Sequence, residues 1–187
     1  YKDVFNRPLN CWRNIKQKLM RISIIGITAS GKTTLAKRIS QKLNIPHLAI
    51  DKLWFEAGGH KLKKFDHKEK EKVRERVKAE VKKLIKQEAW VSDGLYSIVQ
   101  PEIARRADMI IFIDIPMARR LFNHLHRIFF TERPAELNKW DEIKFIYQVI
   151  RRTFVYKPKI RKIISENKDK VKIFKNYKDL NKFVEKL

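Results

Sequence analysis

The feature that most constrains the fold of this chain is a glycine-containing motif that follows a short apolar segment. Residues 26–33 read GITASGKT and match the pattern G-x-x-x-x-G-K-[ST] at every specified position. The preceding residues 22–25 have the character of a strand, and apolar residues then recur at helical spacing up to Leu43. A strand, this motif and a helix in that order predict a loop that binds phosphate groups.

The spacing of the motif follows from the chemistry of anion binding. Gly26 and Gly31 permit backbone conformations that turn successive N–H groups inward around a phosphate, and the following helix points its positive end at the same anion. The Lys32 ammonium is expected to reach the β- and γ-phosphates of ATP or a similar nucleoside triphosphate, and the Thr33 hydroxyl to bind Mg²⁺. The residues predicted to bind the nucleotide are Gly26, Thr28, Ala29, Ser30, Gly31, Lys32, Thr33 and Thr34.

Short apolar runs alternate with amphipathic stretches along the rest of the chain, which indicates an α/β fold with a parallel sheet flanked by helices. Strands are predicted at 22–25, 47–50, 90–92, 109–113 and 171–174. Helices are predicted at about 32–43, at 66–88, from Pro116 onward, at 143–154 and from about Lys178. The 66–88 helix has an apolar stripe at Val73, Val77, Val81 and Leu84, and the 143–154 helix has one at Ile143, Ile146, Tyr147, Ile150 and Phe154. Residues 128–140 break the pattern and predict a mobile loop.

Bulk composition excludes several classes of protein. The chain has 187 residues, of which 43% are hydrophobic, and this is enough for one packed domain. Its single cysteine, Cys11, excludes an internal disulfide and favours a reducing, cytoplasmic location. The sequence contains no apolar run of the roughly 20 residues needed to cross a bilayer, so no membrane partner is expected. Nothing in the composition predicts the oligomeric state.

Residues 1–20 differ from the rest because they contain several asparagines, a proline and no strong period. They also lack the continuous apolar stretch of a secretory signal. We interpret them as a natural extension, an upstream read-through or a segment introduced by cloning, and we expect the folded domain at 21–187.

The net charge is +23, from 44 Lys and Arg against 21 Asp and Glu. Such a charge attracts nucleic acid, anionic membranes or phosphorylated small molecules. The basic residues are spread along the chain rather than gathered in one block, which favours a well-solvated surface. Nucleic acid is therefore a partner that the charge permits but does not identify.

Two aspartates follow predicted strands and would lie near the phosphate loop, at the carboxyl edge of a parallel sheet. Asp51 follows the strand at 47–50, where its carboxylate would accept a hydroxyl proton or hold a substrate, or alternatively cap the next helix. Asp93 follows the strand at 90–92, where it would hold Mg²⁺ as the acidic residue of a Walker B element does.

Arginines offer further candidates. Arg119, Arg120, Arg127 and Arg133 precede or occupy the predicted loop, and the planar fork of arginine suits the phosphate oxygens of a transferring group. The same arginines are equally well explained as solvated surface charges. The five histidines lack the spacing of metal ligands.

Five segments in a fixed order carry a likeness to a known family. They are the phosphate loop at 26–34, Asp51 to Trp54, Trp90 to Ser97, Arg106 to Asp108 and Phe112 to Pro116. Together they resemble the adenylate-kinase-related proteins of the DNA topology modulation (FlaR-like) family. Phosphate loops occur in many families, so the order of the Asp-Lys-Leu and Asp-Gly-x-Tyr-Ser elements carries the specificity. Leu95 departs from the pattern, since relatives usually carry Asn there.

That resemblance implies a P-loop NTPase three-layer sandwich of the nucleoside-monophosphate-kinase-like type, with a five-stranded parallel sheet of strand order 2-3-1-4-5. It also implies a substrate-binding flap at about 55–90 and a helical lid at about 119–140. The arginine-rich pattern of the lid is reduced here to Arg127 and Arg133. The identity of the phosphoryl acceptor is not implied by the match.

Three functions are consistent with these features. The first is an ATP- and Mg²⁺-dependent kinase that transfers the γ-phosphoryl group to a small, anionic acceptor such as a nucleotide or nucleoside. In that kinase Lys32 and Thr33 hold the triphosphate and the metal, and Asp93 supports the metal. Asp51 orients or deprotonates the acceptor. Arg127 and Arg133 stabilise the charge that develops on the transferring group. The second is a nucleic-acid-binding regulatory ATPase, and the third is a nucleotide-binding scaffold with negligible turnover.

Overall fold

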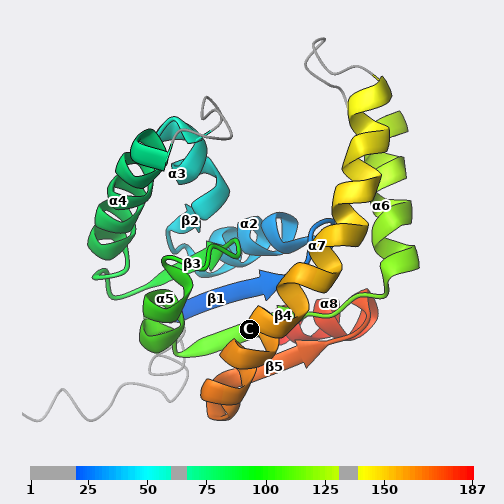
Figure 1. Ribbon diagram of the computed structural model, residues 1–187. Helices are drawn as coiled ribbons and strands as arrows, with labels where there is room; N and C mark the ends of the chain where they lie inside the picture. Colours follow the sequence, from blue (N-terminus) through cyan, green and yellow to red (C-terminus); the bar gives the residue numbers. More distant parts are fainter. Residues whose placement is uncertain (1–19, 60–66, 131–138) are drawn as a thin grey trace, which may run out of the picture.

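The structure is a computed structural model that describes residues 20–59, 67–130 and 139–187. Its centre is a five-stranded sheet in the order β2-β3-β1-β4-β5 (Figure 1). The strands are β1 (Arg21–Gly26), β2 (His47–Ala49), β3 (Trp90–Asp93), β4 (Met109–Ile113) and β5 (Val171–Phe174). Every neighbouring pair is parallel, so the carboxyl ends of all the strands lie at one edge. The α/β class, the five-stranded parallel sheet and the strand order 2-3-1-4-5 are confirmed.

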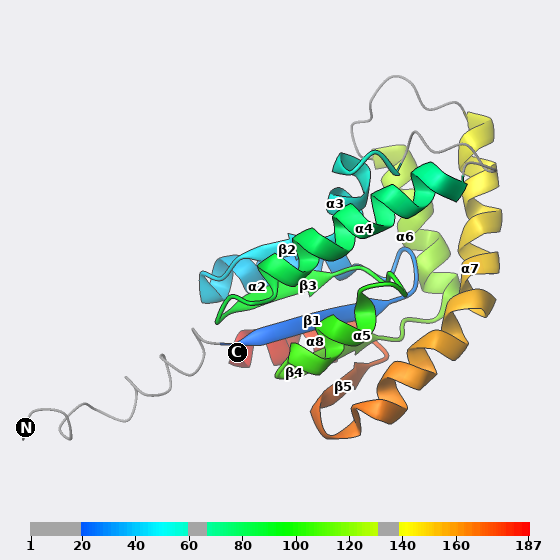
Figure 2. The ribbon, with the colours of Figure 1, turned by 60° about the vertical axis from the view of Figure 1, so that its left-hand side comes forward.

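Helices cover both faces of this sheet. They are α2 (Lys32–Leu43), α3 (Ile50–Glu56), α4 (His67–Leu84), α5 (Gln100–Arg106), α6 (Met117–Phe130), α7 (Lys139–Glu166) and α8 (Tyr177–Lys186), with a short 3₁₀ turn, η2 (Lys168–Lys170). Figure 2 shows α4 and α5 in front of the sheet and α8 behind it. The helices α6 and α7 pack together, and Figure 1 shows them extending side by side beyond the sheet. None of the described helices is long and apolar enough to cross a membrane.

Successive side chains of the central strands point to opposite faces of the sheet, so the apolar core has two layers. In β4, Ile111 and Ile113 pack with the apolar residues of α2 and α8, whereas Ile110 and Phe112 pack with those of α4, α5 and α7. All four side chains are buried. The segment 109–113 is therefore buried on both faces, as its continuous apolar sequence predicted.

The α4 helix packs on the sheet through the narrow stripe that the sequence predicted. Val73, Val77 and Val81 are buried, and the charged residues between them are exposed or half-buried. Leu84 is only half-buried, and the helix ends there rather than continuing to residue 88. The predicted bounds of 66–88 were therefore slightly too wide.

The helix predicted from the apolar residues at 143–154 is confirmed, because α7 covers them all. Val149, Thr153 and Ile160 are buried, whereas Tyr147 and Phe154 are 67% and 72% exposed. The helical period therefore predicted the helix but not which of its residues face the core. The helix is also longer than predicted and continues through Pro158 to Glu166.

Two further boundaries differ from the sequence predictions. The segment 128–140 was predicted as a loop, but α6 continues to Phe130 and α7 begins at Lys139. Residues 131–138 lie outside the described part of the chain. The short helix α5 was not predicted, because seven residues give too few turns for a helical period to stand out.

Candidate functional site

The loop at residues 26–31 joins the end of β1 to the start of α2 through two tight turns. Ala29 and Gly31 have positive φ angles of 64° and 83°, and Gly31 is the N-cap of α2. A side chain at Gly26 would place its Cβ 2.7 Å from Ser30 Oγ and 2.9 Å from the carbonyl oxygen of Ile113. Glycine at position 26 therefore lets the loop fold back closely against the sheet.

The Lys32 side chain folds back over this loop. Its Nζ donates a hydrogen bond to the carbonyl oxygen of Ile27 at 3.1 Å. Burial lowers the pKa of Lys32, and the negative charges of Asp51 and Asp93 partly oppose that shift. The ammonium is thus close enough for the charges of both aspartates to act on it.

Asp93 lies at the end of β3 and is held by two neighbours. The Thr33 hydroxyl donates to its Oδ2 at 2.5 Å, and Nε2 of His47 lies 2.7 Å from its Oδ1. Burial alone would raise the pKa of this carboxyl group, but these hydrogen bonds and the charge of Lys32 outweigh burial, so the pKa is lowered. A buried but ionised carboxylate therefore lies beside the Thr33 hydroxyl.

The pair of Thr33 and Asp93 offers oxygen ligands of the type that Mg²⁺ prefers. In phosphate sites Mg²⁺ takes few protein ligands and keeps several waters. Accordingly, the described residues contain no cluster of three or more His, Cys, Asp and Glu side chains. The residues fit a magnesium ion that is shared with bound phosphates.

Asp51 lies in the first turn of α3, where the N-cap is Ala49. The capping alternative is therefore wrong for Asp51. The phenol of Tyr96 donates a hydrogen bond to the Asp51 carboxylate, and burial together with this carboxylate raises the pKa of Tyr96. The Tyr96 ring also packs against Trp54, with ring centroids 5.6 Å apart. Asp51 is exposed, so its carboxylate remains open to a ligand.

One arginine near this site was missed in the sequence. Arg152, an exposed residue of α7, is close enough for its charge to act on both Lys32 and Tyr96. Its only sequence signal was the basic pair at 151–152, which resembles many other basic pairs in this chain. Arg127 lies on α6 but its side chain is not described, and Arg133 lies outside the described residues.

The Arg120 side chain is buried and bonded within the protein, so it is not open to a ligand. It is 3% exposed, and its guanidinium donates to the carbonyl oxygens of Ile115 and Thr28 and to the hydroxyl of Thr153. These bonds connect α6 to the phosphate loop and to α7. Arg119, its neighbour in sequence, is exposed and lines the pocket described next.

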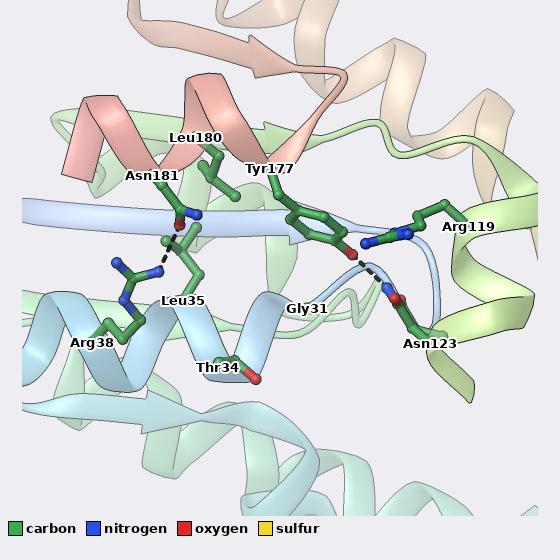
Figure 3. A pocket seen from close by; sticks show the side chains of 10 residues that line it. Gly31, Thr34, Leu35, Arg38, Arg119, Asn123, Tyr177, Leu180 and Asn181 are labelled. Atoms are coloured by element: carbon green, nitrogen blue, oxygen red, sulfur yellow. Dashed lines mark hydrogen bonds between the residues drawn. The ribbon is translucent and has the colours of Figure 1, made fainter. Parts of the chain in front are cut away.

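A pocket of about 410 Å³ adjoins the phosphate loop (Figure 3). Its lining comes from the loop, α2, α6 and α8, and includes Ala29, Gly31, Thr34, Arg38, Arg119, Asn123, Tyr177 and Asn181. Figure 3 shows the Tyr177 ring beside the loop, with Arg119 and Asn123 reaching it from α6. The volume lies within the range of small-molecule pockets, which is about 300–1,000 Å³.

Asn123 and Tyr177 also contact the outer side of the phosphate loop. The Asn123 amide donates to the Tyr177 hydroxyl at 2.6 Å and to the carbonyl oxygen of Ala29 at 3.4 Å. The Tyr177 hydroxyl donates in turn to the carbonyl oxygen of Ser30 at 3.4 Å. These contacts hold the carbonyl oxygens of Ala29 and Ser30 on the side of the loop that faces Asn123 and Tyr177. This favours backbone N–H groups on the opposite side of the loop.

Other predicted nucleotide-binding residues lie in different environments. The Ser30 side chain is fully buried against Gly26, and among the described residues its Oγ is the one buried side-chain polar atom without a hydrogen-bond partner. The Ser30 N–H donates to the Ile27 carbonyl oxygen. Thr34 is exposed and lines the pocket. The carbonyl oxygen of Thr28 accepts from Arg120.

Residues 25–144 match the protein-family model AAA_17, whose description is AAA domain. No curated protein matches the chain. Among solved structures, the chain is similar to shikimate kinase from Bacteroides thetaiotaomicron, with 22% identity, a TM-score of 0.52, and coverage of 83% of this chain and 86% of that one. It is also similar to shikimate kinase from Acinetobacter baumannii in complex with shikimate, with 17% identity, a TM-score of 0.51, and coverage of 80% and 82%.

Proposed function

Because the chain belongs to the AAA_17 family of AAA domains, and because its fold is that of P-loop kinases, we propose that it transfers the γ-phosphoryl group of ATP to a small acceptor. One observation carries the proposal. Lys32 of the phosphate loop is close enough for the charges of two carboxylates to act on it: Asp93, which is tied to Thr33, and Asp51, which is exposed. A phosphate-binding cation thus lies near one carboxylate suited to a metal and one suited to an acceptor.

On the donor side, the triphosphate binds in the loop and the nucleoside occupies the adjoining pocket. The loop residues proposed for this role are Gly26, Thr28, Ala29, Ser30, Gly31, Lys32, Thr33 and Thr34. Thr33 and Asp93 would hold Mg²⁺, which when bound neutralises charge on the phosphate oxygens. The lowered pKa of Asp93 supports this role, because the carboxylate stays ionised at neutral pH.

On the acceptor side, Asp51 orients an acceptor hydroxyl and takes its proton. The acceptor oxygen forms a bond to the γ-phosphorus while the bond from that phosphorus to the β–γ bridging oxygen breaks, which leaves ADP. Tyr96 holds the Asp51 carboxylate in position through its hydrogen bond. Arg152 stabilises negative charge near the transferring group, and we assign the same role to Arg127 and Arg133.

The acceptor is proposed to be small and anionic. Lys32 and Arg152 give the space beside Asp51 a positive field, which favours a phosphate or carboxylate on the acceptor. The solved neighbours are kinases named for one small molecule, shikimate, and this supports a small acceptor here. We further propose that the chain belongs with the DNA topology modulation (FlaR-like) proteins, on the sequence elements at 51–54 and 90–97.

An acceptor screen tests the kinase proposal. Nucleoside monophosphates, nucleosides, small hydroxy acids, sugars and oligonucleotides are incubated with the protein and γ-labelled ATP, and label transfer and ADP release are both measured. We expect transfer to one class of small acceptor. ADP release stimulated by oligonucleotides, without label transfer, would replace the kinase by a nucleic-acid-dependent ATPase.

The Asp51→Asn variant provides the matched control for that screen. We expect it to lose label transfer while it binds ATP as the wild type does, because Asp51 acts on the acceptor alone. Asp93→Asn is instead expected to need a higher magnesium concentration. Identical magnesium titrations of the two variants would contradict the separate roles.

A further inference from the structure

A second cavity lies on the other face of the sheet from the nucleoside pocket. Its volume is about 440 Å³, and its walls are α5, the C-terminal half of α7 and the segment before α5. Figures 1 and 2 show α5 and this half of α7 on the same side of the sheet. Apolar residues line its inner part, among them Leu95, Ala104 and Ile163. We call this cavity the α5–α7 pocket.

The rim of the α5–α7 pocket is more basic than the chain as a whole. Four cationic residues, Arg105, Lys159, Lys162 and Lys170, line it together with one acidic residue, Glu166. That ratio of four to one exceeds the ratio of 44 to 21 for the whole sequence. The charged residues that line the cavity therefore give it a net positive charge.

The four cations differ in how firmly the protein holds them. Lys170 Nζ donates to the carbonyl oxygens of Ala104 and Arg105 at 2.8 and 3.3 Å, at the C-terminal end of α5. Lys162 lies 3.9 Å from Glu166, a long and exposed ion pair that contributes little energy. Within the described part of the chain, the Arg105 guanidinium has no hydrogen bond or ion pair. Lys162 and Arg105 are thus available to an incoming anion.

We propose that the α5–α7 pocket binds a small organic anion with an apolar body. The apolar inner part suits an aryl or alkyl group, and the cationic rim suits a carboxylate, sulfonate or phosphate on the same molecule. The size of the cavity is that of a small-molecule site rather than of a helix-binding groove. A cavity with an apolar part and a cationic rim selects for a ligand that has both an apolar body and an anionic group.

This pocket shares a segment with the proposed acceptor site. Leu95 and Ser97 line the pocket, and Lys159 Nζ lies 3.4 Å from Ser97 Oγ. Tyr96, between them, contacts Trp54 and the Asp51 carboxylate on the acceptor side. An anion that draws Lys159 away from Ser97 would change the restraint on Tyr96, so the ligand acts as an effector of the acceptor site. This last step rests on the proposed function, whereas the binding itself does not.

Binding is tested with 8-anilinonaphthalene-1-sulfonate, a fluorescent anion with an aromatic body. We expect saturable binding to the full-length protein, weakened tenfold or more in the double variant Lys159→Glu, Lys162→Glu. The double variant Lys157→Glu, Arg161→Glu is the matched control, because it makes the same charge change at two exposed positions of α7 that do not line the pocket. Equal affinities of the two double variants would overturn the proposal. Unfolding curves of the three proteins establish that they are equally folded.

Two further measurements separate this site from the donor site. The neutral analogue N-phenyl-1-naphthylamine should bind at least tenfold more weakly, and equal binding would remove the role of the cationic rim. Lys32→Ala should retain wild-type affinity for the sulfonate probe. Loss of probe binding in that variant, or displacement of the probe by ATP in simple competition, would place the probe at the phosphate loop and overturn the proposal.

The link to Tyr96 is measured by hydrogen exchange in the protein without nucleotide. Probe binding is expected to change exchange at the backbone amides of residues 94–97 by several fold, while residues 47–49 at the far edge of the sheet stay unchanged. Unchanged exchange at 94–97 with the probe bound would overturn the effector role. Failure of label transfer in the acceptor screen would instead count against the kinase proposal and leave probe binding as it stands.

Discussion

At the scale of single residues, Lys32 carries the donor side of the site. Its ammonium is already half-buried and bonded to the Ile27 carbonyl oxygen. In Lys32→Ala the charge-assisted contact to phosphate is lost, and we expect ATP affinity to fall by at least about 1.5–3 kcal/mol. The fold should survive, because Lys32 packs on the loop rather than in the core. Isothermal calorimetry that gives equal affinities would contradict the phosphate-loop assignment.

The bond between His47 and Asp93 should appear in the pH dependence of stability. The native pKa of Asp93 lies below its ordinary value of 3.8. Ionised Asp93 therefore stabilises the native state above that value, and this contribution is lost as the pH falls through the lowered native pKa. In His47→Leu one hydrogen bond is missing, so the native pKa rises toward its ordinary value, and the loss of stability on acidification is smaller and is complete at higher pH.

The free energy of unfolding in urea, measured between about pH 2 and pH 6, tests this prediction. His67→Leu is the control, since His67 is exposed at the start of α4. If the free energy of unfolding of His47→Leu falls with decreasing pH in the same way as that of the wild type, His47 does not support the Asp93 carboxylate.

At the scale of elements, Arg120 joins three segments that are distant in sequence. Its guanidinium bonds to the carbonyl oxygen of Thr28 in the phosphate loop and to the Thr153 hydroxyl in α7. In Arg120→Ala buried acceptors lose a charged donor, and we expect a loss of about 3 kcal/mol of unfolding free energy. Arg119→Ala, an exposed neighbour, should change stability by less than about 0.5 kcal/mol. Equal urea midpoints for the two variants would show that the buried bonds add nothing.

The contact between α6 and α8 at the loop leads to a prediction about ATP affinity. Tyr177→Phe keeps the ring but removes the hydroxyl that bonds to Asn123 and to the Ser30 carbonyl oxygen. We expect ATP to bind about two- to tenfold more weakly, as one lost hydrogen bond implies. Tyr147→Phe removes a hydroxyl from an exposed position of α7 and should bind ATP normally. A calorimetric comparison of these two variants shows whether the hydroxyl supports the loop.

The elements that the sequence predicted well are those whose signals are local. The strand at 171–174 has the predicted bounds, and so does α2 at 32–43, which ends at Asn44 with a left-handed φ of 51°. The site was only partly predictable for the same reason. Tyr177 contacts the phosphate loop and Arg152 acts on Lys32 through its charge, both from elements more than a hundred residues away, so their positions depend on how α7 and α8 pack.

At the scale of the whole molecule, the net charge of +23 predicts weak, salt-dependent binding to any nucleic acid. A regulatory ATPase would in addition couple the two ligands, so that bound ATP changes DNA affinity and DNA changes ATP affinity by the same factor. We expect no such coupling. Oligonucleotide affinity at near-physiological salt, with and without a non-hydrolysable ATP analogue, should agree within tenfold, and a larger change would favour the ATPase.

The pocket beside the phosphate loop draws its walls from residues 29–38, 119–123 and 177–181, three stretches far apart in the sequence that meet only when α2, α6 and α8 are in place. A ligand in such a pocket has no partial binding site in a half-folded chain. Ligand binding therefore stabilises the complete fold rather than one local region. It adds RT ln(1 + [L]/Kd) to the free energy of unfolding, which is about 2.7 kcal/mol at a ligand concentration a hundred times Kd. Nucleotide in the cell would therefore protect fully folded chains, whereas misassembled chains would stay exposed to proteolysis.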